Sequence, residues 1–438
     1  MAQAPEGGKA CPGRACPALC WQQPSIKMGV MLSSPVELTR VQRGGSGGLR
    51  CAVGEMQGWR TNHEDAHAFC CEGGDGVFWV LDGHGGEEAS RFCAPRLKQR
   101  SHKLLQEASP GQLPADADFS QMFTDVDQGF RERCMEVPDE QSGSTVIGAV
   151  IRKQQDGTYS LKLLNCGDSR AVVVSSPSNE EASRTKVQSR QPECGVESVW
   201  PCLLETIDHK PNALGEKARI EAAGGMVTMD DPPRLDGNLA VSRGLGDFEY
   251  KSAQSKPPGD QKVSCIPEIY EVTGLPEGSI CILACDGLWD VASNAKVSEM
   301  VHDQLKQNPK SDLGVMAAQL IRKALQENSR DNITVMIIQM QSGLEWAQQS
   351  TRFNPSDEMM FFDKLGDSNT LDDDLKKQYN SFLRMCDFPQ QPVQCSESGR
   401  WYSSMWKCPK TGKIYCNRHN QKKGWAKQQR KEQESSAQ

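Results

Sequence analysis

The sequence predicts an α+β fold in which helices pack on antiparallel β-sheets. Apolar, strand-like runs follow one another along the chain, for example at residues 142–152 and 158–176, without a helix between them. Helical patterns gather instead in two places, after residue 87 and after residue 294. A chain of β-α-β units would alternate strands with helices, so this order favours antiparallel sheets covered by helices.

The first half of the pattern begins near Cys51. Residues 77–81 form an apolar run typical of a buried strand, which stops at Asp82 and two glycine turns, and a helical stretch follows at residues 87–107. The strand-like residues 158–176 are predicted to form a hairpin, because the centre of this run, at residues 166–169, contains the glycine that such turns need.

The second half repeats this design. Residues 279–290 contain an apolar strand that ends in Asp-Gly at Asp286, and helical patterns follow at residues 294–307 and 312–328. A β-branched strand at residues 332–340 completes the pattern. The structured domain is therefore expected to span residues 45–341.

The remaining segments differ in composition. Residues 1–44 are rich in Gly, Pro, Ala and Ser and are expected to form a flexible leader. Residues 175–200 are polar and without periodicity, so a disordered surface insertion is expected there. Residues 342–390 are read as an acidic linker with a helix at 371–386, and residues 391–438 as a basic tail rich in Cys and Trp.

Composition and targeting signals favour an intracellular protein of the cytoplasm or nucleus. Several of the 18 cysteines lie inside apolar runs, as Cys281 does, where they behave as small buried hydrophobes. The sequence shows neither an apolar run of membrane-spanning length nor the apolar core of a secretory signal. The motif that begins Met28-Gly29 fits N-myristoylation, so membrane association is expected only if translation starts at Met28.

The net charge of -7 is unevenly distributed. Residues 400–438 carry a local charge of +8, which leaves -15 on the rest of the chain. An acidic body argues against nucleic-acid binding. The basic tail is expected to attract acidic partners, peptides or membrane phosphates in a salt-sensitive manner, and we expect the protein to be a monomer.

Carboxylates fall where apolar strands end. Asp82 and Asp286 each follow such a strand and precede a glycine, and Asp331 comes just before the last strand. Clustered carboxylates repel one another unless a cation lies between them, and Mg²⁺ and Mn²⁺ prefer oxygen ligands. The glycine beside Asp82 allows close approach of the backbone to a metal. The pattern therefore indicates a divalent-cation site at one end of a sheet.

Eight ordered motifs resemble those of the metal-dependent serine/threonine protein phosphatases of type 2C, the PPM family. In order they are MQGWRTNHEDAH, FWVLDGHGG, SGSTV, NCGDSRAVV, DHKP, LAVSRGLGDF, CDGLWD and SRDNITVMII, and they extend from about Cys51 to Gln341. The resemblance implies a central sandwich of two antiparallel sheets flanked by helices, in four α-β-β-α layers. It also implies a flap at residues 211–243 beside the site.

The resemblance further implies two bridged Mg²⁺ or Mn²⁺ ions and a weaker third. Asp82 would bridge the two, Glu64 and the carbonyl of Gly83 would hold one, and Asp286 and Asp331 the other. Asp65 would accept a hydrogen bond from metal-bound water. The third ion would be held by Asp168 and Asp290 together with Asp286.

A mechanism for phosphorylated protein substrates follows from this resemblance. A hydroxide bridging the metals would attack the phosphorus of phosphoserine or phosphothreonine in line, Arg60 would hold the phosphate oxygens, and His84 would protonate the leaving alkoxide. A non-catalytic pseudophosphatase that only binds partners is the alternative, and a metal-dependent nuclease or other phosphodiesterase is a third reading.

The basic tail allows three readings. Cys395, Cys408, Cys416 and His419 are formally four zinc ligands, although their spacing has no paired C-x2-C. The aromatic residues around Trp401 and Trp406 instead faintly resemble a three-stranded WW domain, which would bind proline-rich peptides. A disordered basic tail is the third reading.

Overall fold

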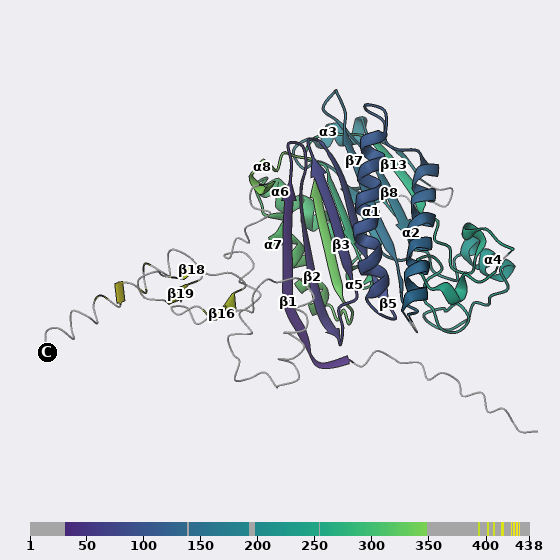
Figure 1. Cartoon of the computed structure of the whole chain (residues 1–438). Helices are drawn as coiled ribbons and strands as arrows, with labels where there is room; N and C mark the ends of the chain where they lie inside the picture. The colour runs from purple at the N-terminus through teal and green to yellow at the C-terminus, as the bar shows by residue number, and fades with distance from the viewer. Residues whose placement is uncertain are drawn as a thin grey trace, which may run out of the picture.

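The computed structural model describes residues 31–347, apart from 138–139, 192–197 and 254, and short stretches between residues 393 and 429. The described residues of the domain form two six-stranded antiparallel sheets that face each other, with helices on both outer faces (Figure 1). This is the predicted α+β sandwich of four layers. Within these ranges none of the helices combines the length and apolar character of a membrane span.

Sheet 1 contains the first strand of the domain and the last. Its order is β1 (Met31–Gly45), β2 (Arg50–Arg60), β15 (Ile333–Gln339), β14 (Ile280–Ala284), β9 (Arg170–Val174) and β11 (Cys202–Glu205). Strands β15, β14 and β9 are largely apolar and almost wholly buried, because helices cover one side of them and sheet 2 covers the other.

Sheet 2 has the order β10 (Gln188–Arg190), β13 (Glu268–Leu275), β8 (Tyr159–Cys166), β7 (Val146–Lys153), β4 (Asp75–Leu81) and β3 (Ala66–Glu72). Its inner face meets sheet 1 through a fully buried layer that includes Phe78, Ile147 and Leu163 from sheet 2 and Val53 and Met336 from sheet 1. This layer fixes the two sheets against each other.

Helices α1 (Glu88–Glu107) and α2 (Asp116–Glu136) cover sheet 2, with Trp79 of β4 packed against Phe123 of α2 at 5.9 Å between ring centroids. Helices α5 (Asp286–Trp289), α6 (Asn294–Gln307) and α7 (Leu313–Gln326) cover sheet 1 (Figure 1). The Asp312 side chain caps α7 by accepting from the backbone N–H of Gly314 at 2.7 Å, which fixes where that helix begins.

Helix α2 was not predicted from the sequence. Its buried positions, Phe119, Met122, Phe123, Val126 and Phe130, do recur at helical spacing. The polar residues between them dilute this pattern, and only packing on sheet 2 gives the helix its stability.

The predicted hairpin at residues 158–176 is wrong. Strand β8 pairs with β7 and β13 in sheet 2, whereas β9 pairs with β14 and β11 in sheet 1. The turn at residues 166–169 therefore carries the chain from one sheet to the other. A glycine turn has the same local sequence in either case, and the partners of the two strands decide the outcome.

Two predicted boundaries also change. Residues 31–44 belong to β1 and not to a flexible leader, since β1 pairs with β2 from Met31 to Gly45. At the other end, α8 (Leu344–Ala347) extends the domain beyond residue 341. Trp346 in α8 is 7% exposed and lies under the guanidinium of Arg50, 5.4 Å from the ring centroid.

The insertion at residues 175–200 is partly ordered, contrary to prediction. It forms α3 (Glu180–Thr185) and β10, whose Gln188–Arg190 pair with Thr273, Val272 and Glu271 of β13. Backbone pairing with an existing sheet edge needs no apolar periodicity, so the polar sequence gave no sign of it.

The described residues of the basic tail include four short strands. Strand β16 (Val393–Gln394) pairs with β17 (Trp401–Tyr402), and β18 (Trp406–Lys407) pairs with β19 (Ile414–Tyr415). The tail's candidate zinc ligands, the expected helix at 371–386 and Gly29 lie outside the described residues.

Candidate metal centre

The predicted metal ligands come from both sheets and meet at one end of the sandwich. Glu64 lies between β2 and β3, Asp82 lies between β4 and the two-residue strand β5 (Gly83–His84), and Asp286 begins α5 directly after β14. Asp331 precedes β15, and Asp168 lies in the turn from β8 to β9. The carboxyl groups of Asp82 and Asp286 are close enough for each to act on the pKa of the other.

The mutual repulsion of these carboxylates is large. Burial and the neighbouring carboxylates of Asp65 and Asp331 raise the pKa of Asp82 well above its ordinary value. Burial and the charge of Asp82 do the same to the pKa of Asp286. Burial also raises the pKa of Glu64 and of Asp331, although the Arg60 guanidinium opposes the effect on both. The protein alone therefore does not neutralise this cluster.

The innermost group of the cluster is formed by Asp65, Asp82 and Cys285. One ligand atom from each lies within 4.8 Å of the other two. Asp65 is 3% exposed; its Oδ2 accepts a hydrogen bond from Thr334 Oγ1 at 2.6 Å, while its Oδ1 is buried without a hydrogen-bond partner. Burial raises the pKa of the Cys285 thiol, so this residue adds a neutral group and not a thiolate ligand.

These residues fit a hard divalent cation. A cation site that holds no ion is expected to have two features. One is a buried carboxylate oxygen without a hydrogen-bond partner, and the other is a set of neighbouring carboxylates with raised pKa values. The available donors are oxygens, which Mg²⁺ and Mn²⁺ prefer. The structure brings together Glu64, Asp65, Asp82, Asp168, Asp286 and Asp331 closely enough for their charges to act on one another.

Asn332 holds the two halves of the site together, a role that the sequence did not indicate. Its Oδ1 accepts from the Glu64 backbone N–H at 2.9 Å, and its Nδ2 donates to the carbonyls of Gln57 and Asn62 at 2.8 and 2.9 Å. Its own carbonyl leaves no room for a side chain at Gly287, where a Cβ would approach it to 2.0 Å. The start of α5, with Asp286, can therefore lie against the loop that carries Asp331.

Arg60 lies beside the carboxylates. Its Nη2 donates to Asp331 Oδ2 at 2.5 Å, and its buried Nε has no hydrogen-bond partner. The side chain is 43% exposed. Burial opposes the charged guanidinium, but the Asp331 carboxylate outweighs burial and raises the pKa of Arg60. A permanently charged planar group with an open donor edge suits a phosphate oxygen.

His84 is paired with Asp247, a residue for which no role was predicted. Nε2 of His84 lies 2.9 Å from Asp247 Oδ2. Burial lowers the pKa of His84, but the Asp247 carboxylate outweighs burial and raises it overall. The only sequence signal for Asp247 was its place after a glycine in the motif LAVSRGLGDF.

A small three-stranded sheet makes this pairing. Strand β6 (Gly143–Ser144) lies between β5, which carries His84, and β12 (Leu245–Gly246), which directly precedes Asp247. Gly143 leaves room for the carboxylate, because a Cβ there would lie 2.1 Å from Asp247 Oδ2. Asp247 itself has left-handed backbone angles, with φ at 52°.

The residues predicted for a third cation lie next to the other carboxylates but are differently engaged. Asp168 is 3% exposed and accepts from Lys210 Nζ at 2.5 Å, so its charge is already partly balanced. Asp290 lies at the exposed end of α5, where its carboxylate repels that of Asp286. A cation at this position would have to displace or share the Lys210 contact.

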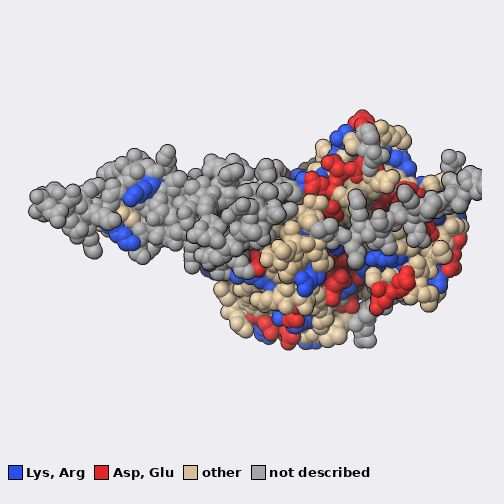
Figure 2. Space-filling model, turned by 90° about the horizontal axis from the view of Figure 1, so that it is seen from below, with Lys and Arg blue, Asp and Glu red and all other residues tan. Residues whose placement is uncertain are grey.

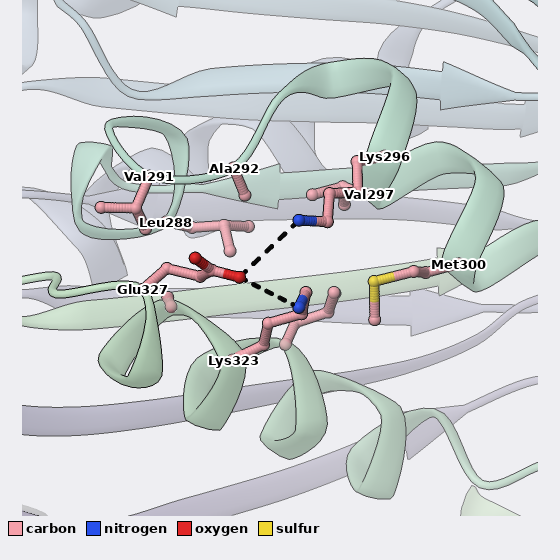
Figure 3. A pocket seen from close by; sticks show the side chains of 10 residues that line it. Leu288, Val291, Ala292, Lys296, Val297, Met300, Lys323 and Glu327 are labelled. Carbon is pink, nitrogen blue, oxygen red and sulfur yellow. Dashed lines mark hydrogen bonds and ion pairs between the residues drawn. The ribbon is translucent and has the colours of Figure 1, made fainter.

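A depression on the outer side of α5 is separate from this centre. Leu288, Val291, Ala292 and Met300 line its apolar part, and Glu327 at its edge pairs with Lys323 at 3.2 Å and Lys296 at 3.7 Å (Figure 3). None of the predicted metal ligands lines it.

Seen from below, acidic and basic side chains are interspersed on the face that Figure 2 shows, without a uniformly basic surface among the described residues.

Carboxylates cluster at one end of a sandwich, with an arginine and a half-buried histidine paired to a buried aspartate beside them, and this arrangement fits a metal-dependent phosphohydrolase. The sequence matches the family of protein phosphatase 2C over residues 49–333. Protein phosphatase 1B of Rattus norvegicus is 32% identical over 326 residues, which cover 71% of this chain and 75% of the rat protein. Protein phosphatase 1A of Homo sapiens is 32% identical over 329 residues, covering 71% and 76%.

Solved structures agree with this relationship. A crystal structure of a phosphatase from a pathogenic strain of Toxoplasma gondii has a TM-score of 0.56 at 25% identity and covers 69% of this chain and 95% of its own. A C. elegans sex determining protein has a TM-score of 0.51 at 22% identity over 69% and 67%, which shows the common fold alone. The chain belongs to the protein phosphatase 2C family, and it is a metal-dependent serine/threonine protein phosphatase that acts on phosphorylated proteins.

Proposed function

We propose that two divalent cations, Mg²⁺ or Mn²⁺, bind at the carboxylate cluster, where Asp82 would be shared by both, Glu64 and the Gly83 carbonyl would hold one, and Asp286 and Asp331 would hold the other. The observation that carries this proposal is the set of mutually repelling carboxylates around the unpartnered Oδ1 of Asp65. When bound, the cations would lower the pKa of a water molecule and offset the charge of the phosphate.

The chain's own residues supply the remaining steps. Arg60 binds the phosphate oxygens with its planar fork and orients the phosphorus for in-line attack by water. As the bond from phosphorus to the new oxygen forms and the bond to the serine or threonine oxygen breaks, His84 gives a proton to the leaving oxygen. Asp247 holds Nε2 of His84, which leaves Nδ1 as the ring nitrogen for this transfer.

The alternative of a non-catalytic binding protein is not supported by the described site. Burial raises the pKa of Glu64, but the charges of Arg60 and His84 both act to lower it, and the partly buried cluster contains the unpartnered Oδ1 of Asp65. The third reading, a nuclease or other phosphodiesterase, gains no support from the family match over residues 49–333.

The direct test is release of phosphate from a phosphothreonine peptide by the purified full chain. We expect turnover with Mn²⁺ or Mg²⁺, none after chelation, and recovery when either cation is added back. The unphosphorylated peptide provides the product standard. Binding of two cations, measured by titration calorimetry, without any turnover would contradict the catalytic assignment.

Cation binding should also depend on pH in a predictable direction. The raised pKa values of Asp82 and Asp286 mean that, without metal, the folded state prefers these groups protonated. Their contribution to stability is full below the unfolded value near 3.9 and is lost as pH rises through the raised values. Cations replace the protons, so Mn²⁺ should raise the melting temperature more at pH 7.5 than at pH 5.

This prediction is checked by thermal unfolding with and without Mn²⁺ at both pH values. A cation at a hundred times its dissociation constant adds about 2.7 kcal/mol, which gives a shift of several degrees. An equal shift at both pH values would mean that the ion binds elsewhere.

A further inference from the structure

A second arginine lies at the edge of the site. Arg330 directly precedes Asp331, and its exposed guanidinium lies over the ring of Trp59, the residue before Arg60, with its central carbon 4.3 Å from the ring centroid. Trp59 is therefore the neighbour of Arg60 in one segment of the chain, and Arg330 is the neighbour of Asp331 in the other. This aromatic and cationic pair, exposed at Arg330, lies one residue along each segment from the Arg60–Asp331 ion pair at the metal centre.

The backbone that carries Arg330 is held firmly on both sides. Ser329 Oγ donates to the Gly287 carbonyl at 2.6 Å, and the Ser329 N–H donates to the Ala324 carbonyl at 3.0 Å. On the other side, the amide of Asn332 fixes the loop to Gln57 and Asn62. With a fixed backbone and one face on the indole ring, the guanidinium loses little entropy when it binds a ligand.

Arg330 has donors to spare. Among the described residues no carboxylate lies within ion-pair distance of it, and its hydrogen bond to Asn328 Oδ1 is long, at 3.4 Å. By contrast, Arg60, Arg91 and Arg170 each pair with a carboxylate at 2.5 to 3.0 Å. Because the face of the Arg330 group lies on Trp59, its N–H edge is left toward solvent.

We propose that Arg330, stacked on Trp59, is a specificity subsite for a second anionic group close to the phosphorylated residue of the substrate. The ligand is an acidic side chain or a second phosphate, since both accept two parallel hydrogen bonds from a guanidinium. An extended peptide advances about 3.3 Å per residue, so the group lies a few residues from the phosphoresidue held at Arg60. This assignment rests on the proposed function of the metal centre.

The test compares the full chain with Arg330→Gln on three phosphothreonine peptides and on p-nitrophenyl phosphate, all with Mn²⁺. The peptides are identical except for flanking positions that hold glutamate, phosphoserine or glutamine. The wild type should prefer each anionic peptide over the glutamine peptide by about five- to tenfold in kcat/KM, mainly through KM. Arg330→Gln should bring this ratio close to one, and Arg330→Lys should restore part of it.

The matched control is Arg184→Gln, because Arg184 is also exposed and stacked on a tryptophan, Trp200, at 3.5 Å, but in the insertion away from the metal centre. This variant should keep the wild-type ratio. A preference for only one anionic peptide identifies the carboxylate or the phosphate as the ligand.

Two outcomes would overturn the subsite. One is a wild type that hydrolyses all three peptides equally. The other is an Arg330→Gln variant that keeps the wild-type preference for the anionic peptides, or that slows all four substrates by the same factor. Equal slowing would mean that Arg330 acts only by positioning Asp331. A wild type that hydrolyses neither peptides nor p-nitrophenyl phosphate would instead contradict the proposed function. In that case, the affinities of the wild type for the same three peptides are compared by equilibrium binding. Equal affinities for the anionic and glutamine peptides would overturn the subsite as well.

Discussion

Asp82→Asn is expected to lower phosphatase activity by roughly a thousandfold, since removing one carboxylate charge from the proposed cation site costs several kcal/mol of transition-state stabilisation. The fold should persist, because the substitution keeps the shape of the side chain and removes a charge that is repelled by its neighbours in the metal-free state. The measurements are kcat/KM on a phosphothreonine peptide and the Mn²⁺-induced rise in melting temperature.

Both quantities should fall together in Asp82→Asn. The control is Asp260→Asn, which changes an exposed carboxylate in a 3-10 turn of the same domain and should alter neither. An Asp82→Asn protein that retains full activity would remove Asp82 from its bridging position.

Asp247→Asn is expected to move the alkaline limb of the pH–rate profile to lower pH. His84 must be protonated to act as an acid, and the Asp247 carboxylate raises the pKa of His84. Without that charge the imidazolium loses its proton at lower pH, so activity on the phosphothreonine peptide at pH 8 should fall by about tenfold or more. The neutral amide still fills the space beside Gly143.

The leaving group separates this effect from general damage. p-Nitrophenolate leaves without protonation, so p-nitrophenyl phosphate should be hydrolysed by Asp247→Asn with a much smaller loss than the peptide. Asp247→Glu keeps the charge and should restore part of the alkaline limb. Equal losses on both substrates, with no shift in the profile, would contradict the role of Asp247 in holding a proton on His84.

The sequence predicted the ends of strands better than the partners of strands. Asp82 and Asp286 were correctly expected at strand ends, because an apolar run that stops at Asp-Gly is visible in the sequence alone. The turn at Asp168 was expected in a hairpin and instead crosses between sheets, since the choice of partner depends on residues far away in the chain. The polar strand β10 was missed for the same reason.

Site residues could be predicted when their residue type and motif indicate their role. They could not be predicted when their role depends on a contact with a distant residue. Carboxylates, Arg60 and His84 could be named from motifs. Asp247 reaches His84 only through strands of two residues each, which are too short to give a periodic signal. Asn332 and Thr334 are polar residues at the start of the last strand of the domain, and their hydrogen bonds to Glu64 and Asp65 exist only once β15 has paired with β2.

The origin of the ligands in both sheets has a consequence for the folding pathway. The bond from the Glu64 backbone to Asn332 closes a loop of 268 positions, and the carboxylates on either side of it cannot meet before strands from the two ends of the domain have paired. Contacts of such long range form slowly and late. A cation captured there binds only the completed sandwich, so metal should slow the domain's unfolding far more than it speeds its folding.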